Sequence, residues 1–150
     1  MIMKKITVLV MTIFVSTIVL AGPGTIVKSG KCTIQEADAF DESKLCVLDL
    51  KNAEVQIVFS IRGGEFFDNF VIMPNPKITN LSDAPKHVAY NLAFFDANGK
   101  LIACTSSNAD LKVGDKNMQT GSSMPGILRS SLGKITSYQA AIYVTEGKKE

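Results

Sequence analysis

The chain of 150 residues has one histidine, three cysteines and no tryptophan. With His87 as its only imidazole, it cannot build a multi-histidine metal site, and a Ser-His-Asp or Cys-His catalytic group would depend on that residue. The sequence also has no GxSxG motif and no phosphate-binding glycine-rich loop that continues into a lysine. It therefore indicates no catalytic residue, no cofactor and no metal site, and we expect a protein that is not an enzyme.

The cysteines contain no CxxC pair, so they indicate a structural bond rather than redox chemistry. Cys32 and Cys46 lie in two β-like runs, residues 25–34 and 44–50, which are joined by a polar stretch. We predict a Cys32–Cys46 disulfide that staples an N-terminal hairpin. Closing a loop of this size contributes about 3 kcal/mol in the chain-entropy model.

Cys104 is left without a partner. Its neighbours Leu101, Ile102 and Ala103 are apolar, so we expect a strand in which Cys104 is a buried thiol that packs as a small hydrophobe. A reactive, metal-binding or intermolecular thiol is the alternative.

The N-terminus has the pattern of an export signal. Lys4 and Lys5 precede an apolar run that ends at Ala21, and this run is short for a membrane span. We predict a signal peptide at residues 1–21, its removal, and a periplasmic or secreted protein without stable membrane insertion. If the signal is not cleaved, it would instead leave a single anchor with the same domain outside the cytosol. Losing the two lysines lowers the formal charge from +2 to 2 − 2 = 0. A neutral chain argues against nucleic acid as the partner.

Apolar residues alternate with mostly polar ones in three runs, which is the pattern of half-buried strands. The runs are residues 54–62, 88–95 and 138–144, and the turn signals between strands lie at 63–64, 74–76, 82–85 and 96–99. No long amphipathic helix is evident. The sequence predicts an all-β protein: one immunoglobulin-like antiparallel β-sandwich domain of about 7–9 strands over residues 22–150, beginning with hairpins over 22–62.

The segments ITNLSDAPKHV (78–88), LAFFD (92–96) and GKLI (99–102) surround the turn predicted at residues 96–99. Together they resemble the FxLYD-type domain and its immunoglobulin-like relatives in bacterial envelope proteins, over about residues 66–145. Leu92, Phe94, Phe95 and Asp96 stand at the Phe, Leu, Tyr and Asp of the family name, and only Asp96 is identical. The resemblance implies a β-sandwich that serves as an extracytoplasmic binding or structural module, without catalytic residues.

Polar and apolar residues interleave between Gly114 and Lys134, as in loops that recognise a partner. Adjacent phenylalanines at 66 and 67 point to opposite faces if they lie in a strand, which would expose one of them. The candidate contact residues are Met118, Gln119, Met124, Ile127, Leu128, Phe66 and Phe67. We expect a binding or structural module that recognises another envelope or extracellular protein, or a copy of itself.

Two other functions are open. The 114–134 segment could plug the active site of a hydrolase as a secreted inhibitor. His87 and Cys104 could instead serve a small metal- or thiol-handling protein, with soft sulfur ligands that suit Cu(I). The methionines that could assist a copper ion are Met73, Met118 and Met124.

Three further motifs favour structural roles. The acids of the 35–43 stretch come from one loop and indicate solvation rather than a calcium site; they are Glu36, Asp38, Asp41 and Glu42. Asp96 to Gly99 has the composition of a tight turn, not the spacing of an EF-hand loop. Asn80 begins an Asn-x-Ser sequence, but we do not expect glycosylation in a chain with a bacterial type of signal.

Overall fold

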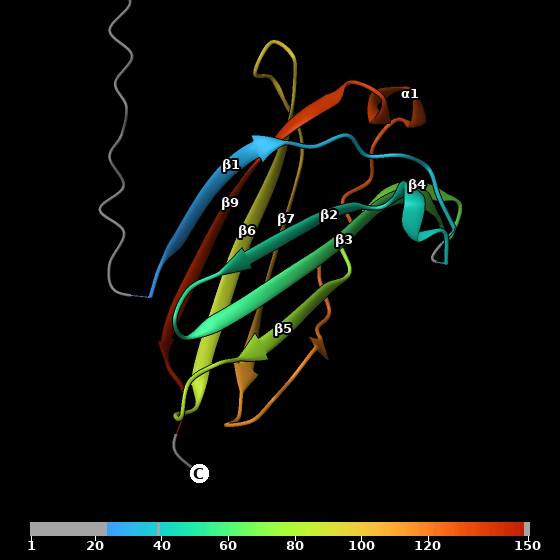
Figure 1. Cartoon of the computed structure of the whole chain (residues 1–150). Coiled ribbons are helices and arrows are strands. Elements are labelled where there is room, and N and C mark those ends of the chain that lie inside the picture. The colour runs from blue at the N-terminus through green and yellow to red at the C-terminus, as the bar shows by residue number, and fades with distance from the viewer. Residues whose placement is uncertain (1–23, 39, 149–150) are drawn as a thin grey trace, which may run out of the picture.

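The computed structural model describes residues 24–38 and 40–148, which form nine strands in two antiparallel sheets packed face to face (Figure 1). Sheet I has the order β1-β9-β6-β7, with β1 (Ile26–Lys31), β9 (Ile135–Glu146), β6 (Lys86–Asp96) and β7 (Leu101–Leu111). Sheet II has the order β2-β3-β5-β8, with β4 on β3: β2 (Cys46–Lys51), β3 (Val55–Phe66), β4 (Asn69–Met73), β5 (Pro76–Asn80) and β8 (Met118–Gln119). The predicted all-β sandwich of 7–9 strands is confirmed. The predicted signal, residues 1–21, lies outside the described residues.

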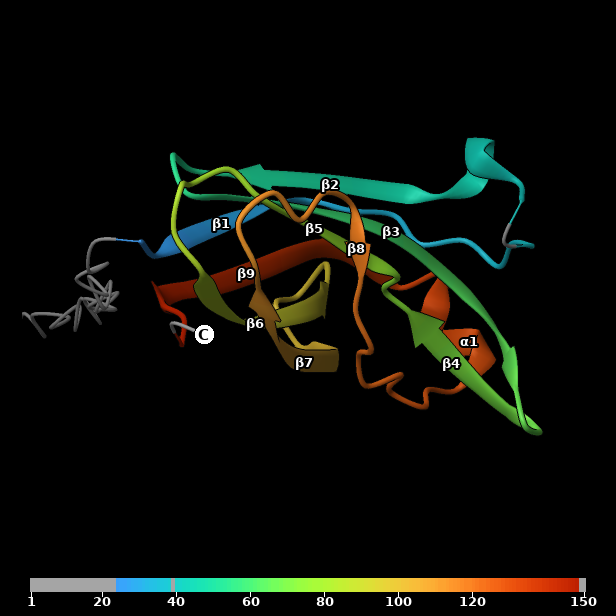
Figure 2. The same ribbon diagram turned by 90° about the horizontal axis from the view of Figure 1, so that it is seen from below.

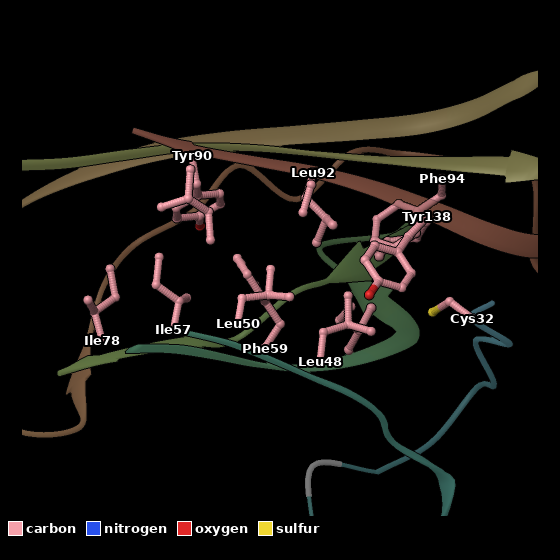
Figure 3. Packing of buried hydrophobic residues seen from close by; sticks show 14 of the residues in the cluster. Cys32, Leu48, Leu50, Ile57, Phe59, Ile78, Tyr90, Leu92, Phe94 and Tyr138 are labelled. Carbon is pink, nitrogen blue, oxygen red and sulfur yellow. The ribbon is translucent and has the colours of Figure 1, made fainter. Parts of the chain in front are cut away.

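The three alternating runs of the sequence supply most of the core. They correspond to β3, β6 and β9, and every apolar residue predicted to face inward from them is buried. Phe59 of sheet II meets Tyr90 of sheet I edge to face, with ring centroids 5.0 Å apart. Figure 3 shows the two inner faces interdigitating, with Leu92, Phe94 and Tyr138 on one side and Leu48 and Leu50 on the other.

The turn predicted at Gly63–Gly64 is wrong, because β3 runs through both glycines to Phe66. Gly63 is required for packing instead. A Cβ atom there would lie 2.6 Å from Cδ2 of Leu132, which belongs to the short helix α1 (Arg129–Leu132). The chain turns at Phe67–Asp68, four residues later, without glycine or proline.

The Cys32–Cys46 disulfide is present, but its strands do not form the predicted hairpin. β1 pairs with β9 in sheet I, whereas β2 pairs with β3 in sheet II. The connection between them crosses from one sheet to the other and includes the 3-10 turn η1 (Glu42–Lys44). The disulfide therefore ties the two sheets to each other at their N-terminal strands.

A polar network around the buried Lys86 closes the lower end of the sandwich in Figure 1. Lys86, only 4% exposed, extends its ammonium group to Glu54 and Glu146, each at an Nζ–Oε1 distance of 2.7 Å. The hydrogen bonds that the Lys86 ammonium donates to these carboxylates, first to Glu146 and then to Glu54, raise the pKa of Lys86 above its usual 10.5. Because Glu54 immediately precedes β3 of sheet II, while Lys86 begins β6 and Glu146 ends β9 of sheet I, the ion pairs join the sheets.

Asn80, 5% exposed, is a second buried polar residue at this end. Its amide nitrogen donates to the carbonyls of Ala84 and Lys112, and its oxygen accepts from the backbone and hydroxyl of Ser82. All of its hydrogen-bonding capacity serves the loops at this end. We call the residues Glu54, Asn80, Lys86 and Glu146 the closed end.

Candidate functional site

The β3–β4 hairpin carries two exposed aromatic side chains next to each other, Phe66 and Phe67, and it reaches the far end of the molecule (Figure 2). Phe40, in the 35–43 stretch, is more exposed still, at 94%, but has no aromatic neighbour among the ring contacts of the described residues. Phe66 pairs with Asn69, which leaves Phe67 and Asp68 as a two-residue turn. Both have positive φ, 45° and 61°, as a type I′ hairpin turn requires. This turn normally takes Asn, Asp or Gly at its first position, so Phe67 is an unusual occupant.

A phenylalanine in the left-handed region costs about 1–2 kcal/mol. Phe67 gains little burial in return, because it is 83% exposed. Its ring contacts that of Phe66 edge to face, with centroids 4.6 Å apart, and Phe66 is itself 43% exposed. Both rings face solvent because Phe66 ends the strand and Phe67 lies in the turn, so the strand alternation does not separate them.

The segment after β8 brings a third apolar side chain to the hairpin. The Ile72 amide donates to the Pro125 carbonyl at 3.1 Å, and the Ile127 amide donates to the Phe70 carbonyl at 2.9 Å. These bonds place Met124 beside the two phenylalanines, around a hollow of about 510 Å³. The hollow is lined by Phe66, Phe67, Asn69, Val71, Met124 and Gly126. We call Phe66, Phe67 and Met124 the tip patch.

Charged residues hold the base of the hairpin. Arg129 of α1 pairs with Glu65 of β3 and, at 3.4 Å, with Glu36. Its guanidinium also lies 4.9 Å from the centroid of the Phe70 ring, a cation–π contact. Arg129 thus joins three segments beneath the tip patch: the hairpin, α1 and the 35–44 loop. These contacts hold the part of the hairpin that carries the exposed rings.

The other acids of the 35–43 stretch make local contacts or face solvent. Asp41 accepts from the Ser43 hydroxyl and pairs with Lys44 at 3.1 Å, and these contacts lower the pKa of its carboxyl. Among residues 24–38 and 40–148, no three side chains of His, Cys, Asp or Glu are grouped to hold a metal ion.

The 114–134 segment is tied along the side of the sandwich between β5 and β7 (Figures 1 and 2). It contacts sheet II through hydrogen bonds from Asn80 to Asp115 and from Asn117 to Thr79, and sheet I through Thr105 to Ser123. Among the predicted contact residues, Met118 and Ile127 pack against the core, whereas Gln119, Met124 and Leu128 are exposed. This segment seals the side of the sandwich and does not project as a loop.

Cys104 is exposed, so the prediction of a buried thiol is wrong. Its neighbours Ala103 and Thr105 face the core, and the alternation of the strand turns Cys104 outward. His87 lies on the same outer face and pairs with Asp110 at 2.7 Å. Cys104 is opposite Ala93, six residues from His87 along β6, or about 20 Å, so one ion cannot bind both side chains.

Two sequence motifs prove to be structural. Asp96 accepts hydrogen bonds from the amides of Asn98 and Lys100, each at 2.9 Å, and so stabilises the β6–β7 turn. Asn80 is buried in the closed end, where its side chain is not accessible to a glycosylating enzyme.

No family model matches the chain, and no curated protein matches it either. No helix within the described ranges 24–38 and 40–148 is long and apolar enough to cross a membrane.

Proposed function

We propose that the protein is an exported, non-catalytic binding module that inserts the tip patch into an apolar pocket of another extracytoplasmic protein. Export is supported by the signal-like N-terminus and by the Cys32–Cys46 disulfide, a bond typical of oxidising compartments. The FxLYD-like segments support the same class of module.

The observation that carries the proposal is the conformation of Phe67. Its backbone is in a region that disfavours aromatic residues, and its ring is exposed. A residue that costs stability and gains little burial in the free protein is expected to contribute to something other than folding. Large rigid aromatic side chains are the usual energetic centres of protein–protein interfaces.

The partner's surface can be described by chemistry. Two rings in contact and Met124 present an apolar, adaptable plug, which fits a concave apolar pocket. Asp68 at the apex and Glu65 below it add negative charge, and Arg129 pairs with Glu65. An anionic membrane or nucleic acid is therefore disfavoured as the target, and a protein pocket with a polar or basic rim is favoured.

The test is affinity capture from the exported fraction of the producing cells, with the mature protein, Phe67→Ser and Val47→Ser as baits. Val47 is also exposed, at 57%, but lies on the outer face of sheet II, away from the hairpin. We expect a discrete partner with the wild type and with V47S, and its loss with F67S. Recovery of the same partner by F67S, or its loss with V47S as well, would contradict the proposal.

A further inference from the structure

The outer face of sheet I has three consecutive rows of side chains without a charge. The strand pairings define the rows, and the strand alternation turns these residues away from the core. From β1 across to β7 they read Ser29, Gln139, Ala93 and Cys104; Val27, Ala141, Asn91 and Ser106; and Tyr143, Ala89 and Asn108.

The outer face of sheet II has the opposite character. Its corresponding rows carry Asp49 beside Val58 and Lys77, and Lys51 beside Gln56. Charged residues are the usual content of a solvated sheet face. The two outer faces belong to the same domain, yet only that of sheet II carries charged residues in these rows. This difference indicates that the face of sheet II is exposed to water, whereas that of sheet I is covered.

The centre of the uncharged face is recessed, because its side chains are small. Among them, Ala93, Cys104, Ser106 and Ala141 line a hollow of about 410 Å³. Asn91 and Gln139 stand beside this hollow, and each amide can both donate and accept a hydrogen bond. Small side chains allow a second sheet to approach closely, and the amides can fill the hollow of a facing sheet. The surface thus has the composition of a sheet-to-sheet contact.

We propose that two copies of the protein pack these faces against each other as a two-fold dimer. A two-fold interface places one surface on itself, so a charged face would meet its own charge, whereas this face meets only neutral and amide groups. The amides of Asn91 and Gln139 are self-complementary across such an axis. The contact would also cover Cys104, which in a monomer is an exposed thiol in an oxidising compartment.

The size of the face sets the expected strength. Four strands about 4.8 Å apart, over the five residues from Ala89 to Ala93 that span the three uncharged rows, outline roughly 19 by 17 Å. This is smaller than a standard protein–protein interface, so the dimer is expected to be weak and reversible and to form only toward the upper end of the concentration range tested below. The tip patch lies outside this face, and the dimer does not depend on the proposed function.

The test is sedimentation of the mature protein from about 1 to 500 µM, under reducing conditions that exclude a disulfide between copies. We expect the mass to rise from monomer to dimer. Ala93→Arg should remain a monomer throughout, because two-fold symmetry would bury the added charge opposite its own copy. Val47→Arg places the same charge on the other outer face and should dimerise like the wild type.

The alkylation rate of Cys104 gives an independent readout on the unmodified protein. It should fall with rising concentration in proportion to the monomer fraction, and should not change with concentration in A93R. Ser106→Arg serves if A93R does not fold, since Ser106 is exposed. A wild type that stays monomeric, an A93R that dimerises normally, or a Cys104 rate independent of concentration would each overturn the proposal.

Discussion

The closed end and the tip patch lie at different ends of the sandwich and differ in which side chains they bury. The closed end buries polar side chains, whereas the tip patch exposes apolar ones. At the closed end, Asn80 and Lys86 are buried although they are polar, and their hydrogen bonds and ion pairs join the two sheets. At the tip, Phe66 and Phe67 are exposed although they are apolar, and Phe67 adopts an unfavourable backbone conformation. The comparison separates residues that stabilise the fold from residues available for a partner.

Two asparagines should show the largest difference between the ends. Asn80→Ala removes a buried amide and leaves the Ala84 and Lys112 carbonyls without that donor, so the free energy of unfolding should fall by about 3 kcal/mol. Asn69→Ala removes one exposed bond to the Phe67 carbonyl and should cost at most about 0.5 kcal/mol. Urea unfolding measures both. Equal losses of unfolding free energy in the two variants would show that the buried hydrogen bonds of Asn80 do not stabilise the fold more than an exposed one.

The base of the hairpin should be sensitive to an added methyl group. Gly63→Ala places Cβ against Leu132, so α1 must shift, and we expect a loss of about 1–2 kcal/mol together with weaker partner binding. Gly133→Ala is the matched control, because nothing lies within 4 Å of its Cβ and its φ of −67° suits alanine. Thermal unfolding and capture of the partner report the two effects. A destabilised G133A would mean that α1 tolerates no change, and the packing argument for Gly63 would fail.

Alkaline pH should lower the stability that the Lys86 ion pairs give to the closed end. The pKa of Lys86 is raised above 10.5, so its ion pairs contribute fully below about pH 10.5 and are lost as the pH rises through the folded-state value. The unfolding midpoint of the wild type should therefore fall above pH 10.5 more steeply than that of Lys86→Met.

The slope that remains in K86M is expected to include Tyr90, whose pKa is raised by burial. Tyr90 stays neutral in the folded state while it ionises in the unfolded chain, so its contribution is also lost at high pH. If the unfolding midpoints of the wild type and K86M fell in parallel with pH, the Lys86 ion pairs would not contribute to stability.

The tip should show the smallest effect on stability, and in the opposite direction. Phe67→Gly relieves the positive φ but loosens the unfolded chain, so we expect unfolding to change by no more than about 1 kcal/mol, with a gain favoured. Partner binding should be lost. A clear loss of stability would show that the Phe66–Phe67 contact supports the fold, and would weaken the functional assignment.

The core residues were predictable because a strand with one buried face must carry an apolar residue at every second position. Every inward residue expected in β3, β6 and β9 is buried. The pairing of β1 and β2 was not predictable, since a disulfide constrains two residues but not the sheets to which their strands belong. Cys104 was misjudged because its apolar neighbours hid the alternation that turns it outward.

The candidate site was only partly predictable. Phe66, Phe67 and Met124 were named from the sequence, and the structure places them around one hollow. The turn was missed because its residues, Phe67 and Asp68, lack the glycine that marks such turns, while Gly63–Gly64 serves packing. Met118 and Ile127 were named on composition alone, yet hydrogen bonds and packing direct them toward the core.

The central claim, that the tip patch contacts a partner protein, is tested most directly by site-specific photocrosslinking. A photoreactive phenylalanine analogue is placed at Phe67 or at Val47, both exposed, and the protein is irradiated in the producing cells. The account predicts one discrete crosslinked protein from position 67, displaced by excess wild type but not by F67S, and none from position 47. Identical products from both positions, or none from position 67, would contradict it.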